Sequence, residues 1–300
     1  MKLAIIGSGI VGQATGRYLL ELGHDVIFED VSTQTLAKLK KERLDTTTSL
    51  EDAIAQSDAA FICVPTPNHN GGEQNLSCII SVSRGVGDAL QSHKGYYTVI
   101  VKSTVLPGTT RDVVKTFLEN GYKKKVGRSI GLCMNPEFLT FIQSTWSLNK
   151  AMDKKPQNEH SIVIGEYDKR SGNVLENIYA RAKAPTYRMS LEEAEFMKYA
   201  NNFLLPVKIS AWNELFLIAK ALKEKGLMDI DTGKIAEILS RDPRIGVYGS
   251  VHGKAYGGPC FSKDPQALQS FASLFRIKVP VLDGVIDTNN KMKDKFGTRE

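Results

Sequence analysis

The sequence predicts an α/β protein in which a doubly wound parallel sheet is followed by an all-α domain built on one long helix. Two observations support this prediction. Short apolar segments with the pattern of buried strands alternate with helical segments in the first part of the chain. A capping box, Ser190-Leu191-Glu192-Glu193, then opens a helical pattern that continues to about Lys225. We therefore expect two domains, residues 1–189 and residues 190–300.

The expected elements of the first domain are short and apolar, as buried parallel strands should be. The strands are residues 2–6, 25–29, 58–64, 97–101, 130–134 and 161–165. Helices are expected after the first strand and at residues 76–91 and 109–119. In the second domain, Pro206 should kink the long helix, and further helices are expected at residues 232–240, 265–275 and 280–295.

Composition narrows the kinds of protein this chain can be. It has 300 residues, 42% apolar and 24% charged, which is typical of a globular protein. The net charge of +6 suits an anionic small molecule at least as well as nucleic acid. The chain opens on an apolar strand rather than a signal peptide, and no apolar segment is long enough for a membrane span. We expect a cytoplasmic protein that binds neither nucleic acid nor membranes.

The cysteines and histidines do not indicate disulfides or a metal site. Cys63 and Cys133 end apolar strand-like segments and are expected to be buried and unpaired, which fits a reducing compartment. The five histidines are scattered and lack metal-ligand spacing. We therefore expect no bound metal.

A glycine-rich turn, Gly7-Ser8-Gly9-Ile10-Val11-Gly12, joins the first strand to the first helix, and Asp30 follows about 20 residues later. This context predicts dinucleotide binding in a Rossmann-like domain. The first glycine permits a tight turn, the second lets a pyrophosphate approach the backbone, and the third lets the helix pack on the strand. Asp30 would bind the adenosine ribose and repel a 2′-phosphate, so NAD is favoured over NADP. Glu29 is expected to lie on the other face.

Polar residues also follow three later strands, at the edge where such sheets bind ligands. The segments are Val64-Pro65-Thr66-Pro67, residues 102–109 and Asn135-Pro136-Glu137-Phe138-Leu139. Ordinary turn chemistry explains most of their prolines. It explains Thr104 and Glu137 less well, because they lie where the reactive end of the cofactor is expected.

The long helix carries polar residues among apolar ones. Lys198 and Asn202 are one turn apart, and Asn213 falls near the same meridian. Two interpretations are open. These residues form a polar stripe that faces a binding site, or Lys198 is a surface lysine whose stem lies on apolar residues. A helix of this length commonly bridges domains or forms a dimer core, so we expect a homodimer.

The segment from Gly257 to Asp264 brings Cys260 to the front of a predicted helix. The helix start and Lys263 both favour a thiolate, which makes Cys260 a candidate nucleophile. A buried structural cysteine is the alternative. The glycine-rich loop that precedes it, residues 249–258, could wrap a sugar or a phosphate.

Together these motifs resemble those of the UDP-glucose/GDP-mannose dehydrogenase family, most closely its UDP-glucose-oxidising members. The matching segments, in the family's order, are the glycine turn with Asp30, Cys63–Pro67, Lys102–Val105, Asn135–Leu139, the Lys198/Asn202 helix, Arg244–Gly246 and Gly257–Asp264. The resemblance implies NAD-dependent oxidation of a nucleotide sugar, UDP-glucose to UDP-glucuronate, for polysaccharide biosynthesis. Cys260 would hold the intermediate aldehyde as a thiohemiacetal and then as a thioester.

The resemblance also implies roles for the other site residues. Lys198 would stabilise the oxyanion, with Asn202 as a further donor. Asp264 would be the base for the alcohol proton and would position water together with Thr104. Glu137 would be the general acid and base of thioester hydrolysis.

The implied binding sets are larger. The cofactor set is Gly7, Gly9, Ile10, Val11, Gly12, Asp30, Val64, Pro65, Thr66, Ser103, Thr104 and Lys263. The substrate set is Phe138, Leu139, Lys198, Asn202, Arg244, Tyr256 and Gly257, with Lys263 as a further candidate. In the family, the arginine that matches Arg244 reaches a neighbouring subunit's site.

Two departures from the family leave alternatives open. Phe141 stands where members usually carry a glutamate, and residues 142–153 are unlike the family's. The chain also stops at Glu300, roughly where a third, nucleotide-binding domain is expected to begin, either because it is naturally short or because it is truncated. The alternatives are GDP-mannose or another UDP-sugar as substrate, and an NAD-binding protein that has lost catalysis.

Overall fold

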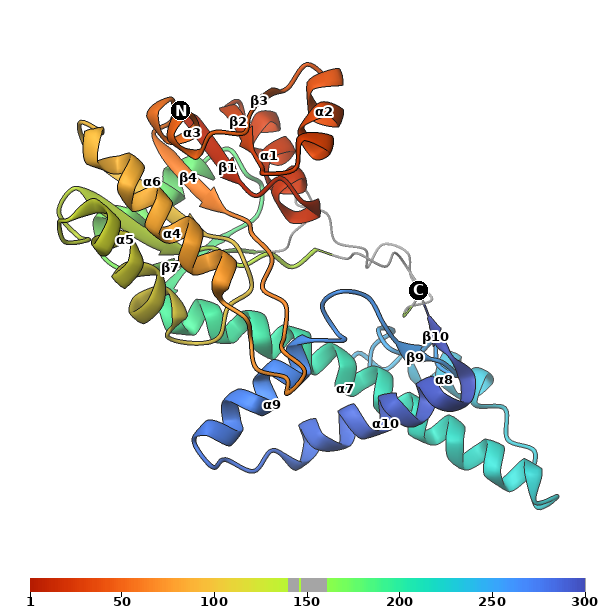
Figure 1. The fold of residues 1–300 in the computed structure, drawn as a ribbon. Coiled ribbons are helices and arrows are strands. Elements are labelled where there is room, and N and C mark those ends of the chain that lie inside the picture. The colour runs from red at the N-terminus through yellow and green to blue at the C-terminus, as the bar shows by residue number, and fades with distance from the viewer. Residues whose placement is uncertain (140–145, 147–160, 300) are drawn as a thin grey trace. The chain divides into compact units, whose positions relative to one another are not determined.

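The computed structural model describes residues 1–139, 146 and 161–299. They form two compact units (Figure 1). Among the described residues, the first unit consists of 1–67, 74–138 and 161–198, and the second consists of 68–73, 139, 146 and 199–299. The domain boundary expected between residues 189 and 190 stays a prediction, and the unusual segment that includes Phe141 lies outside the described residues.

The first unit is built on an eight-stranded sheet of order β3-β2-β1-β4-β5-β6-β7-β8. Its strands are β1 (Lys2–Ile6), β2 (Asp25–Glu29), β3 (Asp45–Thr47), β4 (Ala59–Ile62), β5 (Tyr97–Val101), β6 (Ile130–Met134), β7 (Ile162–Glu166) and β8 (Thr186–Ser190). The order reverses at β1 and β4, as in a doubly wound Rossmann-like sheet. The predicted fold class is confirmed.

One strand direction differs from the prediction. Strands β1 to β6 are joined by parallel pairs, but β7 runs antiparallel to β6, with Met134 opposite Gly165, and β8 is parallel to β7. The sheet is therefore mixed rather than wholly parallel. A strand that is buried on both faces has the same apolar pattern in either direction, so its sequence does not reveal this.

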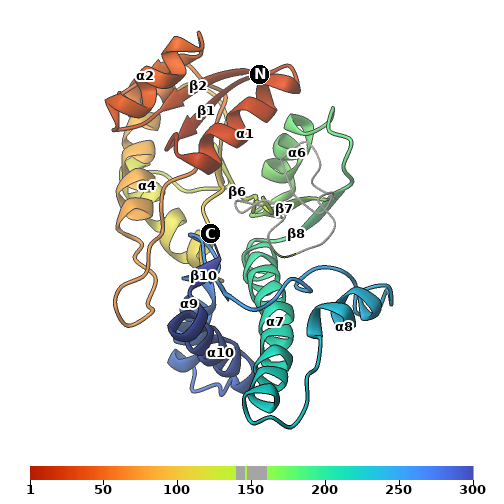
Figure 2. The same cartoon turned by 90° about the vertical axis from the view of Figure 1, so that its right-hand side faces the viewer.

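Helices cover both faces of the sheet (Figure 2). One face packs against α3 (Leu50–Ala55), α4 (Ser77–Ala89), α5 (Lys115–Tyr122) and the start of α7 (Leu191–Glu224). The other face packs against α1 (Ile10–Glu21), α2 (Thr33–Lys41) and α6 (Lys169–Ile178). Neighbouring residues of β5, Val99 and Ile100, enter opposite cores, as the alternation of side chains along a strand requires.

Short elements were harder to predict than long ones. No element was expected at α2, β3, α3, α6 or β8, and the end of the helix expected at residues 76–91 is a 3₁₀ turn, Leu90–Ser92. The helix expected at residues 109–119 is present, but it begins as a π-helix, Thr109–Val114, and continues as α5. The capping box before α7 is confirmed, because Ser190 N donates to Glu193 at 2.8 Å and Glu193 N donates to Ser190 Oγ at 3.2 Å.

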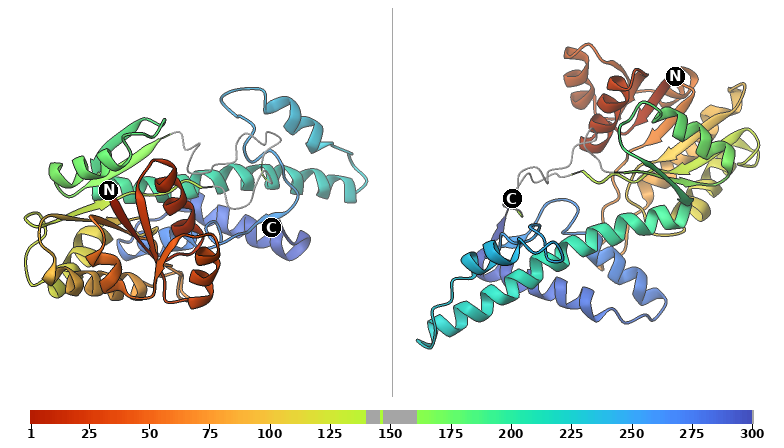
Figure 3. Two further views of the ribbon diagram at one scale, coloured as in Figure 1. Left: turned by 90° about the horizontal axis from the view of Figure 1, so that it is seen from above. Right: turned by 180° about the vertical axis from the view of Figure 1, so that it is seen from behind.

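The second unit is largely helical (Figure 3). It contains the rest of the 34-residue α7, α8 (Thr232–Leu239), α9 (Asp264–Leu274), α10 (Pro280–Phe296), and the two-residue strands β9 (Ala255–Tyr256) and β10 (Thr298–Arg299). Pro206 lies inside α7, and the expected kink stays a prediction. A small core forms where Trp146, Ile209, Tyr256 and Val285 meet. None of the helices in the described part of the chain has the length and apolarity needed to cross a membrane.

Candidate active site

The glycine turn after β1 has the shape that a dinucleotide needs. Gly7 has a φ of 90°, which favours glycine. A Cβ on Gly12 would lie 2.0 Å from the carbonyl oxygen of Gly7, whereas a Cβ on Gly9 would meet nothing within 4 Å. There is thus no room for a side chain at Gly12, where α1 packs on β1. There is free space at Gly9, where a pyrophosphate would approach the backbone. Ile10 is exposed and Val11 is half-buried at the same turn.

Asp30 is held against this turn. Its Oδ2 accepts a hydrogen bond from Ser8 N at 2.7 Å, and its Oδ1 accepts one from Ser32 N at 2.8 Å. The carboxylate is therefore oriented by the backbone on either side of it. A ribose that reaches this edge would meet an acceptor already in position.

The neighbouring Glu29 is buried, with 6% of its surface exposed. Burial, together with the charge of Asp30, raises the pKa of Glu29 to about 7. The end of β2 thus carries one half-buried acid at the glycine turn and one buried acid beside it.

The loops that follow β4 and β5 are joined by side chains. Thr66 Oγ1 donates to the carbonyl of Thr104 at 2.8 Å, and Ser103 Oγ donates to the carbonyl of Val64 at 2.7 Å. Gln74 adds a third contact, since its amide nitrogen donates to the carbonyl of Thr104 at 2.9 Å. The structure therefore brings these predicted cofactor residues together, with Pro65 exposed among them.

A buried carboxylate holds the next part of the second loop. Glu195, on the second turn of α7, has no exposed surface and accepts hydrogen bonds from Gly108 N at 2.6 Å and from Thr110 N at 2.7 Å. Gly108 has a φ of 91° and immediately precedes the π-helix. Burial raises the pKa of Glu195 to about 7, although the bonds to Gly108 and Thr110 oppose the shift. Sequence reasoning missed Glu195; the available signal was an acid three residues before Lys198 on the same helix.

Lys198 and Glu137 form a buried ion pair in the first unit. Lys198 Nζ donates to Glu137 Oε1 at 2.9 Å and to the carbonyl oxygen of Glu137 at 2.6 Å. Their side chains are 3% and 4% exposed. The ammonium also lies 5.5 Å from the centre of the Phe138 ring. Three predicted site residues thus meet at the carboxyl end of β6.

A second buried lysine supports the same loop. Lys102 Nζ donates to Asn135 Oδ1 at 2.9 Å and to the carbonyl of Pro136 at 3.3 Å. The hydroxyl of Tyr179 donates to the same oxygen of Asn135 at 2.9 Å. Sequence reasoning noted Lys102 and Asn135 only as parts of motifs and gave neither of them this role.

In the second unit, Asp264 is the centre of a polar cluster. Asn202 Nδ2 donates to Asp264 Oδ2 at 2.7 Å, and Lys263 Nζ contacts Asp264 Oδ1 at 2.5 Å. Asp264 is 1% exposed. The structure therefore brings together three predicted residues that come from α7 and from the start of α9.

Cys260 was expected at the front of a helix, with the helix itself at residues 265–275, and the structure places α9 at Asp264–Leu274. Cys260 lies in a turn, and α9 begins four residues later at Asp264. The carbonyl of Cys260 accepts hydrogen bonds from Lys263 N at 3.1 Å and from Asp264 N at 2.9 Å. The chain reaches Cys260 through Gly257, Gly258 and Pro259, and the hydrogen-bonded turn follows. The α-helix starts after this turn.

The remaining predicted residues differ in exposure. The side chain of Arg244 is 87% exposed and pairs with Asp242 at 2.6 Å. Tyr256 and Gly257 are buried, and Leu139 is half-buried. Asn213 does not end a free polar stripe, because its amide accepts from Gly253 N at 2.9 Å and donates to the carbonyl of Lys254 at 3.0 Å.

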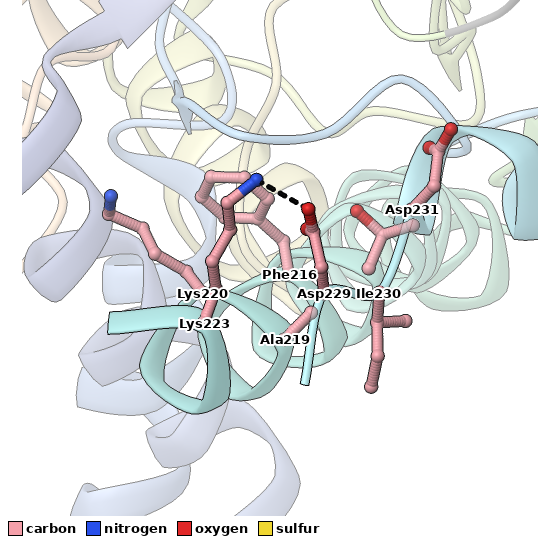
Figure 4. Close-up of a pocket in the computed structure, with 8 residues that line it drawn as sticks. Phe216, Ala219, Lys220, Lys223, Asp229, Ile230 and Asp231 are labelled. Atoms are coloured by element: carbon pink, nitrogen blue, oxygen red, sulfur yellow. Dashed lines mark hydrogen bonds and ion pairs between the residues drawn. The ribbon is translucent and has the colours of Figure 1, made fainter. Parts of the chain in front are cut away.

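A hollow in the second unit lies along the end of α7 and the start of α8 (Figure 4). It is lined by Phe216, Ala219, Lys220, Lys223, Asp229, Ile230, Asp231 and Thr232. Two of these residues, Lys223 and Asp229, form an ion pair at 2.8 Å. None of the predicted site residues lines it, so we do not assign it to the candidate active site.

Comparison with known proteins agrees with these motifs. Sequence models of the UDP-glucose/GDP-mannose dehydrogenase family match this chain with their NAD binding domain at residues 35–183 and their central domain at residues 192–291. The chain belongs to this family. The recognition made from the sequence is therefore confirmed, and so is NAD as the cofactor.

The similar proteins include two kinds of sugar-nucleotide dehydrogenase. The chain is 33% identical to the GDP-mannose 6-dehydrogenase of Pseudomonas aeruginosa, over 98% of this chain and 70% of that protein. It is 31% identical to a UDP-glucose 6-dehydrogenase of Haloferax volcanii, over 99% of this chain and 71% of that protein. Among solved structures, a UDP-glucose dehydrogenase from Pyrobaculum islandicum matches with a TM-score of 0.83 at 30% identity, over 98% of this chain and 68% of that one. Membership of this family makes the chain an oxidoreductase of the NAD-dependent nucleotide-sugar dehydrogenase type.

Gly12→Ala is expected to destabilise the protein, and Gly9→Ala is its matched control. A methyl group at position 12 would meet the backbone oxygen of Gly7, which cannot move aside, whereas position 9 has open space. We expect Gly12→Ala to lower the unfolding free energy by about 1–3 kcal/mol. Gly9→Ala should keep its stability and weaken NAD⁺ binding in calorimetry. Equal thermal stability of the two variants would contradict the packing described for this turn.

Glu29→Gln is expected to stabilise the protein more at alkaline than at acid pH. The carboxyl has a pKa of about 7 when folded and 4.5 as the ordinary value. Between these values the folded chain holds a proton that the unfolded chain has lost, so the native protein loses stability as the pH rises, and glutamine does not. Chemical denaturation gives the unfolding free energy of the variant and of the native protein. The difference between the two should be larger at about pH 8 than at about pH 5, by on the order of 2 kcal/mol. An advantage that is the same at both pH values would disprove the assigned burial.

Proposed function

We propose that this protein oxidises the C6 alcohol of a nucleotide-linked hexose to the acid, with UDP-glucose as substrate and UDP-glucuronate as product. The observation that carries the proposal is the buried pair of Lys198 and Glu137 at the carboxyl edge of the sheet. An ion pair with both members almost wholly buried is costly to build, and such groups concentrate at functional sites. The edge on which it lies is where a sheet of this type binds ligands.

The reaction requires two oxidations and one hydrolysis. NAD⁺, held at the glycine turn and Asp30, would supply the hydride acceptor for both oxidations. The alcohol loses a proton and a hydride to become the aldehyde. The thiol of Cys260 adds across the aldehyde carbonyl, and loss of a second hydride and a proton leaves a thioester. Water then cleaves the carbon–sulfur bond, which releases the acid and restores the thiol. Covalent attachment keeps the aldehyde from escaping between the two oxidations.

Lys198 and Glu137 have the charges that two of these steps would use. Lys198 would stabilise the oxyanion that forms when the thiol or water attacks. Glu137 is held 2.9 Å from Lys198 and would act as general acid and base in thioester hydrolysis. Thr104, which is half-buried on the loop after β5, would position water.

Cys260 and Asp264 would be the nucleophile and the base of the proposed reaction. Asp264 would accept the alcohol proton, and its two oxygens are oriented by Asn202 and Lys263. Asn202 would also donate to the oxyanion, and Lys263 and Arg244 would bind the substrate. These roles and those of the first unit are part of the proposal.

GDP-mannose is the second candidate substrate. The GDP-mannose 6-dehydrogenases of Pseudomonas aeruginosa and Pseudomonas putida are each 33% identical to this chain. A panel of UDP-glucose, GDP-mannose and other UDP-sugars, compared by kcat/KM, separates the candidates. We expect UDP-glucose to have the highest value.

Cys260→Ser tests the covalent mechanism. The native protein should form two NADH for each molecule of glucuronate. The serine variant should lose acid formation by at least about 10²-fold, because a serine hydroxyl is not ionised at neutral pH and is a much poorer nucleophile than a thiolate. Absorbance measures the NADH formed, and product analysis measures the glucuronate. No turnover by the native protein with any nucleotide sugar would reject the proposed activity, and full activity of Cys260→Ser would reject the thioester.

We also propose that the protein is a homodimer in the cytoplasm. Leu204, Leu215 and Ile218 repeat along α7 at helical spacing, and their exposed fractions are 59%, 48% and 59%. Apolar side chains in such a row favour a two-fold helix contact. Light scattering should give twice the chain mass of 33.1 kDa. A monomer would exclude any contribution of Arg244 to a neighbouring subunit.

A further inference from the structure

Asn289, on α10, makes a pair of hydrogen bonds that the proposed reaction does not use. Its Oδ1 accepts from Tyr256 N at 2.8 Å, and its Nδ2 donates to the carbonyl of Tyr256 at 3.1 Å. One side-chain amide therefore satisfies both backbone groups of one residue. It takes the place that a neighbouring strand would occupy in a sheet.

The same short segment is bonded on its other side. Ala255 N donates to the carbonyl of Gly297 at 3.0 Å, and β9 pairs in parallel with β10. Next along the chain, a Cβ on Gly257 would lie 2.4 Å from Cγ2 of Thr298. The segment is thus held between α10 and β10, and its exit is packed too closely for any side chain.

This segment leads directly to the proposed nucleophile. Only Gly257, Gly258 and Pro259 separate Tyr256 from Cys260. Gly258 has a φ of 81°, and proline restricts its own φ. The Tyr256 ring also meets the Phe261 ring edge-on, with centroids 6.1 Å apart. A shift of Tyr256 would therefore be passed on to the cysteine.

We propose that Asn289 is a positioning residue for Cys260. It fixes the backbone of Tyr256 and thereby the place at which the loop presents the thiol. The inference rests on the proposed function, in which Cys260 attacks the aldehyde. Asn289 itself takes no part in the chemistry.

Asn290 provides a matched control, because it is the next residue of α10 and is exposed. The variants are Asn289→Leu, which removes both bonds, and Asn289→Asp, which keeps the size and the acceptor but cannot donate to the carbonyl of Tyr256. The controls are Asn290→Leu and Asn290→Asp. Asn289→Asp also serves as the milder variant if Asn289→Leu does not fold.

Two readouts test the proposal. Hydrogen exchange at residues 255–261, followed by mass spectrometry without substrate, should be faster in both Asn289 variants than in both Asn290 variants. The kcat for the sugar nucleotide should fall by about 10- to 10²-fold in Asn289→Leu, because a displacement of about 1 Å has effects of this size. The kcat of Asn289→Asp should lie between those of Asn289→Leu and the native protein. The KM for NAD⁺ of both variants should stay within about two-fold of the native value.

Several outcomes would overturn the inference. One is that hydrogen exchange at residues 255–261 is the same in the Asn289 variants as in the native protein. Another is that exchange is faster but kcat is native. The third is that the KM for NAD⁺ rises while kcat does not change. An inactive native protein is a different result: it rejects the proposed activity, and with it the reaction that Asn289 would serve, whereas the exchange data still report whether Asn289 holds the loop.

Discussion

The first two turns of α7 hold two strand-end loops of the sheet through one buried carboxyl group and one buried lysine. Glu195 binds the backbone of Gly108 and Thr110 after β5, and Lys198 binds Glu137 after β6. Because Lys198 and Glu137 are buried, removing either side chain takes away a charged partner that water cannot readily replace. The helix therefore fixes both loops relative to the sheet rather than merely covering it.

This constraint links the packing of the first unit to its chemistry. Preorganised polar groups stabilise a developing charge without having to move at the moment of reaction. A lysine with two bonds to Glu137 has little rotational freedom left, and Lys102 bonds the preceding residues Asn135 and Pro136. The loop that carries Glu137 is thus held at three consecutive residues.

The second unit uses the same principle where its chain is irregular. Buried backbone groups need partners, and the long segment before α9 finds some of them in a two-residue ladder and in turns of its own. Side chains from the helices add others: Lys208 donates to the carbonyl of Ile245, Asn213 bonds residues 253 and 254, and Asn289 bonds Tyr256. Helix side chains therefore help to order the loop that leads to Cys260.

The sequence was informative where a local pattern determines the structure. The glycine turn, the apolar strands and the capping box of α7 each follow from residues close together in the chain, and each was predicted. The direction of β7 depends on a long connection, and the partners of Glu195 and Asn289 are 85 and 33 residues away, so no local pattern revealed them. Cys260 was expected at the front of a helix because glycine, proline and an acid mark such starts, and α9 itself begins one turn later, at Asp264.

Hydrogen exchange of the Gly108 and Thr110 amides, resolved residue by residue in Glu195→Gln, tests the hold of α7 on these loops most directly. Glutamine keeps the size of the side chain but has only one oxygen to accept both bonds. We predict that the two amides exchange at least about 10-fold faster than in the native protein or in Glu224→Gln, a change at an exposed position at the other end of α7, while the amides of β1 do not change. Equal exchange rates in Glu195→Gln and the native protein would contradict the account.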